Sequence, residues 1–161
     1  MNRRGTTLKY LTTFLILTAC LFSVDAPRSS VFRNDNGFID YANRLIVSRG
    51  TASIIAKEIS QGDLNAVGKN LKLSKGEARA QARENLLDLV KLVNFDGRTV
   101  GEMMVSDPLT ERRVETLVGS AYQQGEIEYL ERKEVAIALA VKMSGLAEIL
   151  VDAGGYMNEN L

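Results

Sequence analysis

Residues 74–93 read SKGEARAQARENLLDLVKLV, and the apolar period of this stretch predicts an amphipathic helix. Ser74 and Glu77 stand three residues apart ahead of the apolar run, which is the spacing of a capping box, so the helix is predicted to begin at Ser74. Small residues come first and larger ones follow, which would let the start of the helix approach a sheet closely. The apolar face consists of Ala78, Ala82, Leu86, Leu89, Val90 and Val93.

A second pattern, further along the chain, has the period of a strand. From Glu134 to Met143, larger apolar side chains alternate with alanines and a lysine. Residues 121–130 alternate more weakly, and two antiparallel strands joined near Glu131-Arg132 account for both stretches. An amphipathic helix is the alternative for the second stretch, because alanine favours helices. The alternating set is Val135, Ile137, Leu139, Val141 and Met143.

The stretch before the helix predicts another strand. Residues 41–55 are rich in β-branched side chains, and Gly50 interrupts them, which suggests a bulge or bend. Residues 56–73 mix Gly62, Gly68 and Asn70 with scattered apolar residues and have no clean period. We expect a loop there that could hold one short helix.

Turn and capping signals follow the helix. Asp96-Gly97 is typical of a tight turn. Thr99 and Glu102 repeat the capping-box spacing ahead of a short helix that contains Met103 and Met104. Methionines at such positions usually fill a core, and an adaptable contact surface is the alternative.

Asp107 and Pro108 restart the helical pattern. Asp107 is a candidate N-cap, and Pro108 stands at the first helical position, where its missing N–H costs nothing. The helix is predicted to run to Val118 and to end at Gly119.

A last apolar run, from Leu146 to Val151, predicts a final helix that stops at Gly154-Gly155. Together the segments predict an α+β fold, a small antiparallel sheet of about three strands packed against two or three helices. With 161 residues, 45% of them hydrophobic and 25% charged, the chain has the composition of one globular domain.

The N-terminal segment has the layout of a lipoprotein signal. A basic leader precedes an apolar run, residues 10–24, that is short for a membrane span. Within the run, Leu17-Thr18-Ala19-Cys20 looks like a lipobox, and it contains the only cysteine of the chain. Cys20 is therefore predicted to be lipid-modified and to become the mature N-terminus. The basic residues of the leader are Arg3, Arg4 and Lys9.

Two other fates of this segment stay open. Ordinary signal cleavage after Ala26 has small residues available, but Pro27 would follow the cut. Retention as a short anchor is favoured by Leu21, Phe22 and Val24, which continue the apolar run past the cysteine. In that case Cys20 is a small apolar residue of an anchor helix.

Residues 25–37 are rich in Pro, Ser, Asn, Asp and Gly, a composition that predicts a flexible tether. The predicted organisation is a signal peptide over residues 1–19, a lipidated N-terminus and tether over 20–38, a single α+β domain over 39–155 and a C-terminal tail over 156–161.

Composition excludes several functional classes. The chain contains no histidine, so Ser-His-Asp and Cys-His catalysis and His-ligated zinc are impossible. Removal of residues 1–19 would take away three of the 20 Lys and Arg residues and none of the 20 Asp and Glu residues, which leaves a mildly acidic protein. No basic stripe with interleaved aromatic residues is evident, so nucleic acid is not an expected partner.

Two groupings of carboxylates are candidate sites. Asp107, Glu111 and Glu115 recur every four residues along one predicted helix, and Glu126 and Glu128 share one face of a predicted strand. A solvated helix face and an edge strand protected by charge explain them more simply. No catalytic, cofactor-binding or metal-binding residue is predicted.

The order of elements resembles the Lpp-twenty family of small bacterial outer-membrane lipoproteins. The resemblance covers most of residues 41–143 and implies a role in assembly, since relatives occur among flagellar basal-disk and flagellar assembly proteins. The chain departs from the family pattern in its longer 56–73 segment and in a hairpin turn without Asp-Gly or Asn-Gly. The resemblance rests on the lipobox-like leader and on Ala78, Ala82, Asn85, Leu86, Val93–Gly97, Thr99-Val100, Asp107, Val114 and Val118-Gly119-Ser120-Ala121.

The function expected from the sequence is that of a non-enzymatic lipoprotein of the bacterial cell envelope. It would be tethered to a membrane through lipidation of Cys20 and would act on an envelope protein or on a second copy of itself. Leu21 follows the cysteine where an aspartate often retains lipoproteins at the inner membrane, so the outer membrane facing the periplasm is the expected location, with the inner membrane as the alternative. An anchored or secreted periplasmic domain that binds a small ligand or cell-wall component is the alternative function.

Overall fold

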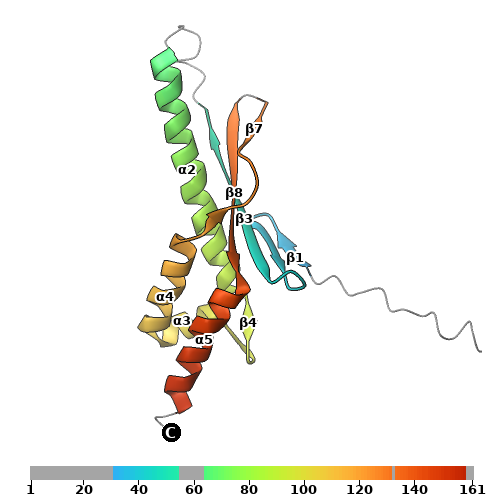
Figure 1. Cartoon of the computed structure of the whole chain (residues 1–161), viewed down its shortest axis with the longest axis vertical. Coiled ribbons are helices and arrows are strands. Elements are labelled where there is room, and N and C mark those ends of the chain that lie inside the picture. Colours follow the sequence, from blue (N-terminus) through green and yellow to red (C-terminus); the bar gives the residue numbers. More distant parts are fainter. Residues whose placement is uncertain (1–30, 55–63, 132, 159–161) are drawn as a thin grey trace, which may run out of the picture. The chain divides into compact units, whose positions relative to one another are not determined.

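The computed structural model of the chain describes residues 31–54, 64–131 and 133–158 (Figure 1). Cys20, the predicted signal peptide and residues 20–30 of the predicted tether lie outside the described residues. By its contacts the chain divides into Met1–Ser30 and Val31–Leu161, and the second unit contains every element below. Its strands are β1 (Val31–Asn34), β2 (Gly37–Asp40), β3 (Leu45–Ser53), β4 (Asn94–Phe95), β5 (Arg98–Thr99), β6 (Tyr122–Gln123), β7 (Glu128–Leu130) and β8 (Glu134–Lys142), and its helices are α2 (Leu64–Lys91), α3 (Val100–Ser106), α4 (Pro108–Gly119) and α5 (Met143–Asn158).

The predicted α+β class is confirmed. The main sheet is antiparallel and six-stranded, with the order β1-β2-β3-β8-β6 and with β7 also paired to β8. It therefore has more strands than the three predicted, and the described residues form four helices against the two or three expected. Short strands account for the larger number of strands, because β1, β2, β6 and β7 have only two to four residues each.

The centre of the sheet is the long pairing of β3 with β8. Its register runs without interruption from Leu45↔Lys142 to Ser53↔Glu134. The strand predicted from Glu134 to Met143 is confirmed up to Lys142, while Met143 is wrong because it begins α5 (Met143–Asn158). The helical alternative for residues 134–142 is wrong because every position of this segment pairs with β3. The bulge suggested at Gly50 is also wrong, since Gly50 pairs in register with Ile137.

Gly50 allows helix α2 to pack closely against strand β3. A Cβ atom there would lie 2.1 Å from the carbonyl oxygen of Ala78 and 2.4 Å from the backbone nitrogen of Ala82. Beside it, the buried Ser48 hydroxyl donates a hydrogen bond to the Ala82 carbonyl at 2.6 Å. The small residues of the helix therefore do allow close packing on the sheet, and the glycine of β3 is the complementary half of that contact.

The prediction that the helix begins at Ser74 is wrong, as is the loop with one short helix expected over residues 64–73; residues 56–63 of that predicted loop lie outside the described residues. Helix α2 begins at Leu64, so Ser74 lies inside it. The Ser74 side chain is buried and its hydroxyl lies 2.9 Å from the carbonyl oxygen of Ser53 and 3.0 Å from that of Asn70, four residues earlier. Its hydroxyl thus donates to carbonyl groups instead of capping a helix N-terminus, a common use of serine within helices.

The prediction that the tether extends to residue 38 is wrong. Strands β1 and β2 pair from Val31↔Asp40 to Asn34↔Gly37, so the folded unit begins before residue 39. The Asn34 side chain accepts hydrogen bonds from the backbone N–H groups of Asn36 and Gly37 at 3.0 and 3.2 Å. The polar residues that suggested a tether are the turn of this hairpin.

The single strand predicted over residues 121–130 is divided in two. Between the pairs Gln123↔Leu139 and Glu128↔Ala136, four residues of one strand face two of β8, so residues 124–127 bulge out. Gly125 takes a φ of 77° in this bulge, and Ile127 packs against the core. The predicted junction near Glu131-Arg132 is confirmed, because β7 and β8 pair up to Leu130↔Glu134.

Local signals predicted the shorter elements well. Asp96 and Gly97 have φ angles of 50° and 80° in the turn between β4 and β5. Thr99 and Glu102 form the predicted capping box of α3. Helix α4 has Pro108 at its first position and ends at Gly119, as expected.

The final helix is longer than predicted. Helix α5 begins at Met143 instead of Leu146, and it continues through Gly154-Gly155 to Asn158 instead of stopping at the glycines and leaving a tail from residue 156. Glycine in a helix costs about 1 kcal/mol relative to alanine, which weakens a helix without ending it.

The core lies between one face of the main sheet and the helices. Met103 and Met104 are both buried in it, which confirms core filling as their role. Its largest fully buried side chains are Ile39, Ile46, Leu86, Leu89, Ile137, Leu139, Leu146 and Leu150.

Candidate interaction surface

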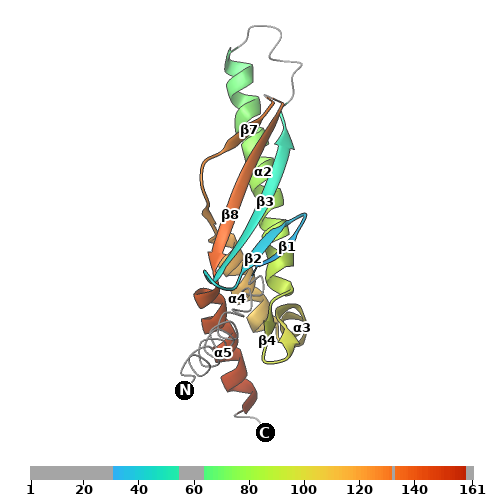
Figure 2. The same cartoon turned by 90° about the vertical axis from the view of Figure 1, so that its right-hand side faces the viewer.

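One face of the main sheet is covered by no described helix. Helix α2 contacts β2, β3 and β8 from the other face, and α3 and α4 pack against α2. Figure 2 looks onto the uncovered face, where β3 and β8 lie in front of α2. We call this surface the open face. Side chains alternate between the two faces of a sheet, so the core residues of each strand identify their open-face neighbours.

The strand register aligns one row of side chains across the open face. Arg33 pairs with Phe38, Phe38 with Val47, Val47 with Ala140 and Ala140 with Tyr122. The row crosses β1, β2, β3, β8 and β6, so it joins segments that are more than a hundred residues apart in the sequence. Cross-strand neighbours of this kind are close enough to contact one another.

The row is apolar in the middle and aromatic toward both ends. Val47 and Ala140 are buried, Phe38 is half-buried and Tyr122 is 43% exposed. The Arg33 guanidinium lies over the Phe38 ring, 5.6 Å from its centroid. The small side chain of Ala138 on β8 leaves a depression in the surface beside the row. A hollow of about 360 Å³ opens there, lined by Arg33, Asn34, Asp35, Gly37, Phe38, Val47, Ser48, Arg49 and Ala138.

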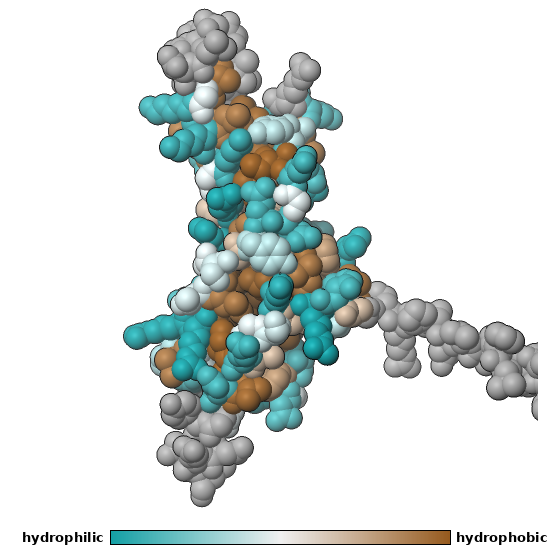
Figure 3. Space-filling view, in the orientation of Figure 1, coloured by the Kyte–Doolittle hydropathy of each residue, from teal (hydrophilic) through white to brown (hydrophobic). Residues whose placement is uncertain are grey.

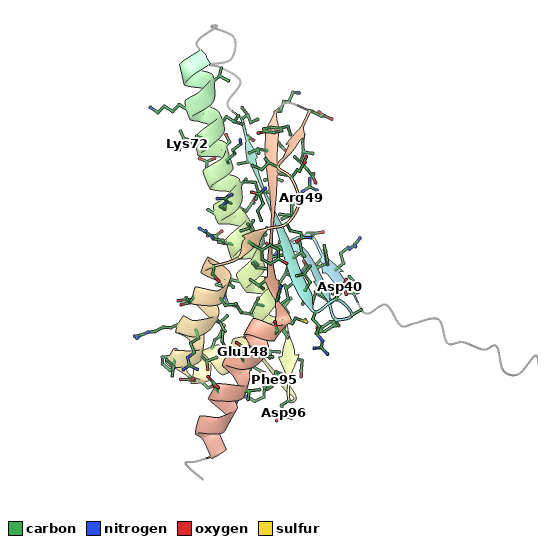
Figure 4. All side chains as sticks on the ribbon, viewed as in Figure 1. Asp40, Arg49, Lys72, Phe95, Asp96 and Glu148 are labelled. Atoms are coloured by element: carbon green, nitrogen blue, oxygen red, sulfur yellow. The ribbon has the colours of Figure 1, made fainter. Side chains whose placement is uncertain are left out.

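Charges of both signs surround the row. Arg49 on β3 forms an ion pair with Glu128 on β7, and both side chains are about half exposed. Figure 4 places Arg49 and Asp40 on the sheet side of the molecule. The pKa of Asp40 lies below its ordinary value, first because the backbone N–H of Asn43 donates to the carboxylate and then because the Asn43 side chain does. Asp40 therefore stays ionised well into the acid range.

A second depression lies between α4 and α5 and reaches Tyr122 and Ala140 at the end of the row. Two adjoining hollows of about 440 and 300 Å³ share Leu117, Ser120, Gly145 and Glu148 in their linings. A Cβ on Gly145 would lie 3.1 Å from Leu117 Cδ1, so this glycine lets the two helices approach. Arg113 and Asp152 link the helices by an ion pair at 3.2 Å. We call this depression the α4–α5 groove, and its lining combines apolar side chains with Arg112 and Glu148.

The carboxylate groupings considered from the sequence do not form a site. Asp107 caps α4 by accepting hydrogen bonds from the backbone N–H groups of Leu109 and Thr110. Glu126 lies in the bulge outside the strands, while Glu128 pairs with Arg49. Within residues 31–54, 64–131 and 133–158, no group of three or more Cys, Asp or Glu side chains is placed to hold a metal ion.

The open-face row was not predicted from the sequence because two of its five residues, Arg33 and Phe38, belong to the hairpin assigned to the tether. A signal was present, since Asn34-Asp35-Asn36-Gly37 stands between short runs with apolar residues, Val31-Phe32 and Phe38-Ile39, and such a cluster of Asn, Asp and Gly is typical of a turn. No helix in the described part of the chain is long and apolar enough to span a bilayer.

Comparison of the chain with models of protein families, with curated proteins and with solved structures gives no match. The resemblance to the Lpp-twenty family stays a prediction that rests on the residues quoted for it.

Proposed function

We propose that this chain is a membrane-tethered interaction module of the bacterial cell envelope, anchored through Cys20, whose open face binds the open face of a second copy. No catalytic step is part of the proposal. The anchored location is the outer membrane, facing the periplasm, with the inner membrane as the alternative. The observation that carries the interaction role is the row of Phe38, Val47, Ala140 and Tyr122 on a sheet face that no helix of the described residues covers.

The sequence Leu17-Thr18-Ala19-Cys20 behind a basic leader supports the anchor. Stable attachment to a membrane takes about two acyl chains or two signals, because one chain binds only reversibly. Diacylation of the cysteine in a lipoprotein meets that requirement.

The size and charge of the open face support a second copy as the partner. At strand spacings of about 4.8 Å and rises of about 3.4 Å per residue, the open face covers about 500 Å², or about 1,000 Å² for two copies, near the lower limit for a specific interface. Its charges include Arg33 and Arg49 as well as Asp40 and Glu128. Two such faces related by a twofold axis can pair opposite charges around an apolar centre.

The anchor is tested by metabolic labelling with a fatty acid in bacteria that express the full chain. We expect label on the wild-type protein, none on Cys20→Ser, and an intact mass that corresponds to loss of residues 1–19 plus the lipid. An unlabelled wild-type protein, or one that keeps its N-terminal residues, would refute the anchor.

Self-association is tested by sedimentation velocity of the full chain carrying Cys20→Ser in a mild detergent. Tyr122→Arg should weaken the dimer by about tenfold or more, because it places a second cation in the apolar row. Val105→Arg is the matched control, since Val105 is 90% exposed on α3, away from the open face. A wild-type chain that stays monomeric, or equal weakening by both variants, would contradict this use of the open face.

The α4–α5 groove favours a second candidate function, binding of a small ligand such as a cell-wall peptide. Its mixed lining offers Leu117 and Ile149 for apolar groups and Arg112 for a carboxylate. A ligand that binds the native state raises the thermal midpoint by mass action. We would measure that midpoint with a peptidoglycan stem peptide. Stabilisation of the wild type but not of Arg112→Gln would support the second candidate, and no stabilisation would remove it.

A further inference from the structure

Helix α2 carries five basic residues on one side. They recur at steps of three and four, which keeps them within about 120° of the helix circumference at about 100° per residue. Over about 1.5 Å per residue, the row extends for about 21 Å along the helix. Figure 4 shows Lys72 on the side of α2 away from the sheet, and Figure 3 shows hydrophilic side chains projecting from that side. We call this row the basic stripe: Lys69, Lys72, Lys75, Arg79 and Arg83.

The charge of the basic stripe is not neutralised by neighbours. The acidic residues of the helix, Glu77, Glu84 and Asp88, fall outside the sector of the stripe at 100° per residue. Among the described residues, no carboxylate lies within ion-pair distance of any stripe residue. Two members have neutral neighbours: Arg79 donates to the Gln123 side chain at 3.1 Å, and Lys75 lies 5.7 Å from the centroid of the Tyr129 ring.

The basic stripe contrasts with the rest of the chain. Residues 64–83 contain five basic residues and one acidic residue, whereas the whole chain has 20 of each. Such segregation creates a local positive potential that attracts anionic partners.

An exposed apolar side chain of α2 lies beside the stripe. Leu73, between Lys72 and Lys75 in the sequence, is 56% exposed, and Ala80 beyond it is exposed as well. Cations with an exposed leucine beside them suit the boundary between headgroups and acyl chains of a bilayer. Nucleic acid would call for a series of exposed aromatic rings, whereas the described residues place one half-exposed ring, Tyr129, beside a stripe cation, Lys75.

We infer that the basic stripe binds the surface of an anionic phospholipid bilayer, so that α2 lies along the membrane. The choice of a bilayer rests on the proposed function, because the anchor at Cys20 would hold the domain beside one. The binding itself needs no lipid on the cysteine. It would give the protein a second, electrostatic contact with the membrane that carries it.

The experiment is vesicle sedimentation of the full chain carrying Cys20→Ser, so that a failure of lipidation in cells cannot affect its outcome. The vesicles are phosphatidylcholine, with or without phosphatidylglycerol. The test variant combines Lys69→Gln, Lys72→Gln and Arg83→Gln. The matched control removes the same charge elsewhere, with Arg44→Gln, Arg98→Gln and Lys133→Gln. A charge-conserving variant, Lys69→Arg, Lys72→Arg and Arg83→Lys, shows whether charge alone is needed.

We expect binding to phosphatidylglycerol vesicles to fall about fivefold for each stripe cation removed, and thus about a hundredfold in the test variant. The control variant should change far less, the charge-conserving variant should bind like the wild type, and binding to neutral vesicles should be the same for all chains. Added salt should weaken wild-type binding to anionic vesicles. Equal losses in the test and control variants would overturn the inference, as would wild-type binding that ignores phosphatidylglycerol. Displacement of the vesicles by single-stranded DNA would overturn it in favour of nucleic acid.

Discussion

Substitution of Gly50 by alanine tests how closely α2 packs on β3. The added Cβ would lie 2.1 Å from the Ala78 carbonyl oxygen and 2.4 Å from the Ala82 nitrogen. Both obstacles are backbone atoms of a helix whose neighbouring side chains are fully buried, so no side chain can rotate away to make room.

The expected loss follows from that geometry. An ordinary carbon–oxygen contact needs more than 3 Å, so the helix would have to move by about 1 Å from β3 along its most tightly packed stretch. Overpacking of a core costs about 1–3 kcal/mol, and the upper value applies where backbone must shift. We therefore expect Gly50→Ala to lower the free energy of unfolding by about 3 kcal/mol and the thermal midpoint by about 10 °C.

The assay is urea unfolding of the full chain, followed by circular dichroism. Gly76→Ala is the matched control, because Gly76 lies inside α2 and a Cβ there has no atom within 4 Å. That variant should gain about 0.5–1 kcal/mol, since alanine is the better helix former. If Gly50→Ala stayed within about 0.5 kcal/mol of the wild type, the close approach of α2 to β3 would not hold as described.

Two further predictions concern hydrogen bonds, one made by a buried serine and one made by a capping aspartate. Ser48→Ala should lower the free energy of unfolding by about 1–2 kcal/mol, because the buried hydroxyl donates to the Ala82 carbonyl at 2.6 Å. Thr116→Ala removes an exposed hydroxyl and should change the free energy of unfolding little. Urea unfolding of the two variants would compare these losses. The pKa of Asp107 lies below its ordinary value, mainly because the Thr110 hydroxyl and then the Leu109 N–H donate to the carboxylate. A carboxylate whose pKa is lower folded than unfolded stabilises the native state at neutral pH, and that contribution is lost as the pH falls below about 4 through the folded-state pKa. The stability advantage of the wild type over Asp107→Asn, which caps without titrating, should therefore shrink in acid, and a pH-independent difference would contradict the capping role.

Signals within a few residues predicted structure reliably. The capping box of Thr99 and Glu102, the cap and first position at Asp107 and Pro108, and the turn at Asp96-Gly97 were all found as expected. Each depends on hydrogen bonds or φ angles inside one turn, so the residues that set it are adjacent in the sequence.

Features that depend on distant partners were predicted less well. Ser74 looked like a helix cap because its alternative acceptor, the Ser53 carbonyl, comes from another element. Gly50 suggested a bulge because the helix that requires it is nearly thirty residues away. Residues 31–38 looked like a tether because their strands are short and gain their stability from β3.

The sequence by itself determined the α+β class, the amphipathic part of α2, the caps of α3 and α4, and the candidate anchor Leu17-Thr18-Ala19-Cys20, because each is written in composition or in periods of two to four residues. Only the tertiary structure decided the open face and the α4–α5 groove, and it showed which side of α2 is left for the basic stripe. The physical reason is that a surface is defined by what packs against the opposite side. The register that aligns Phe38, Val47, Ala140 and Tyr122 is fixed by burial of their neighbours in the core, and no local pattern encodes that alignment.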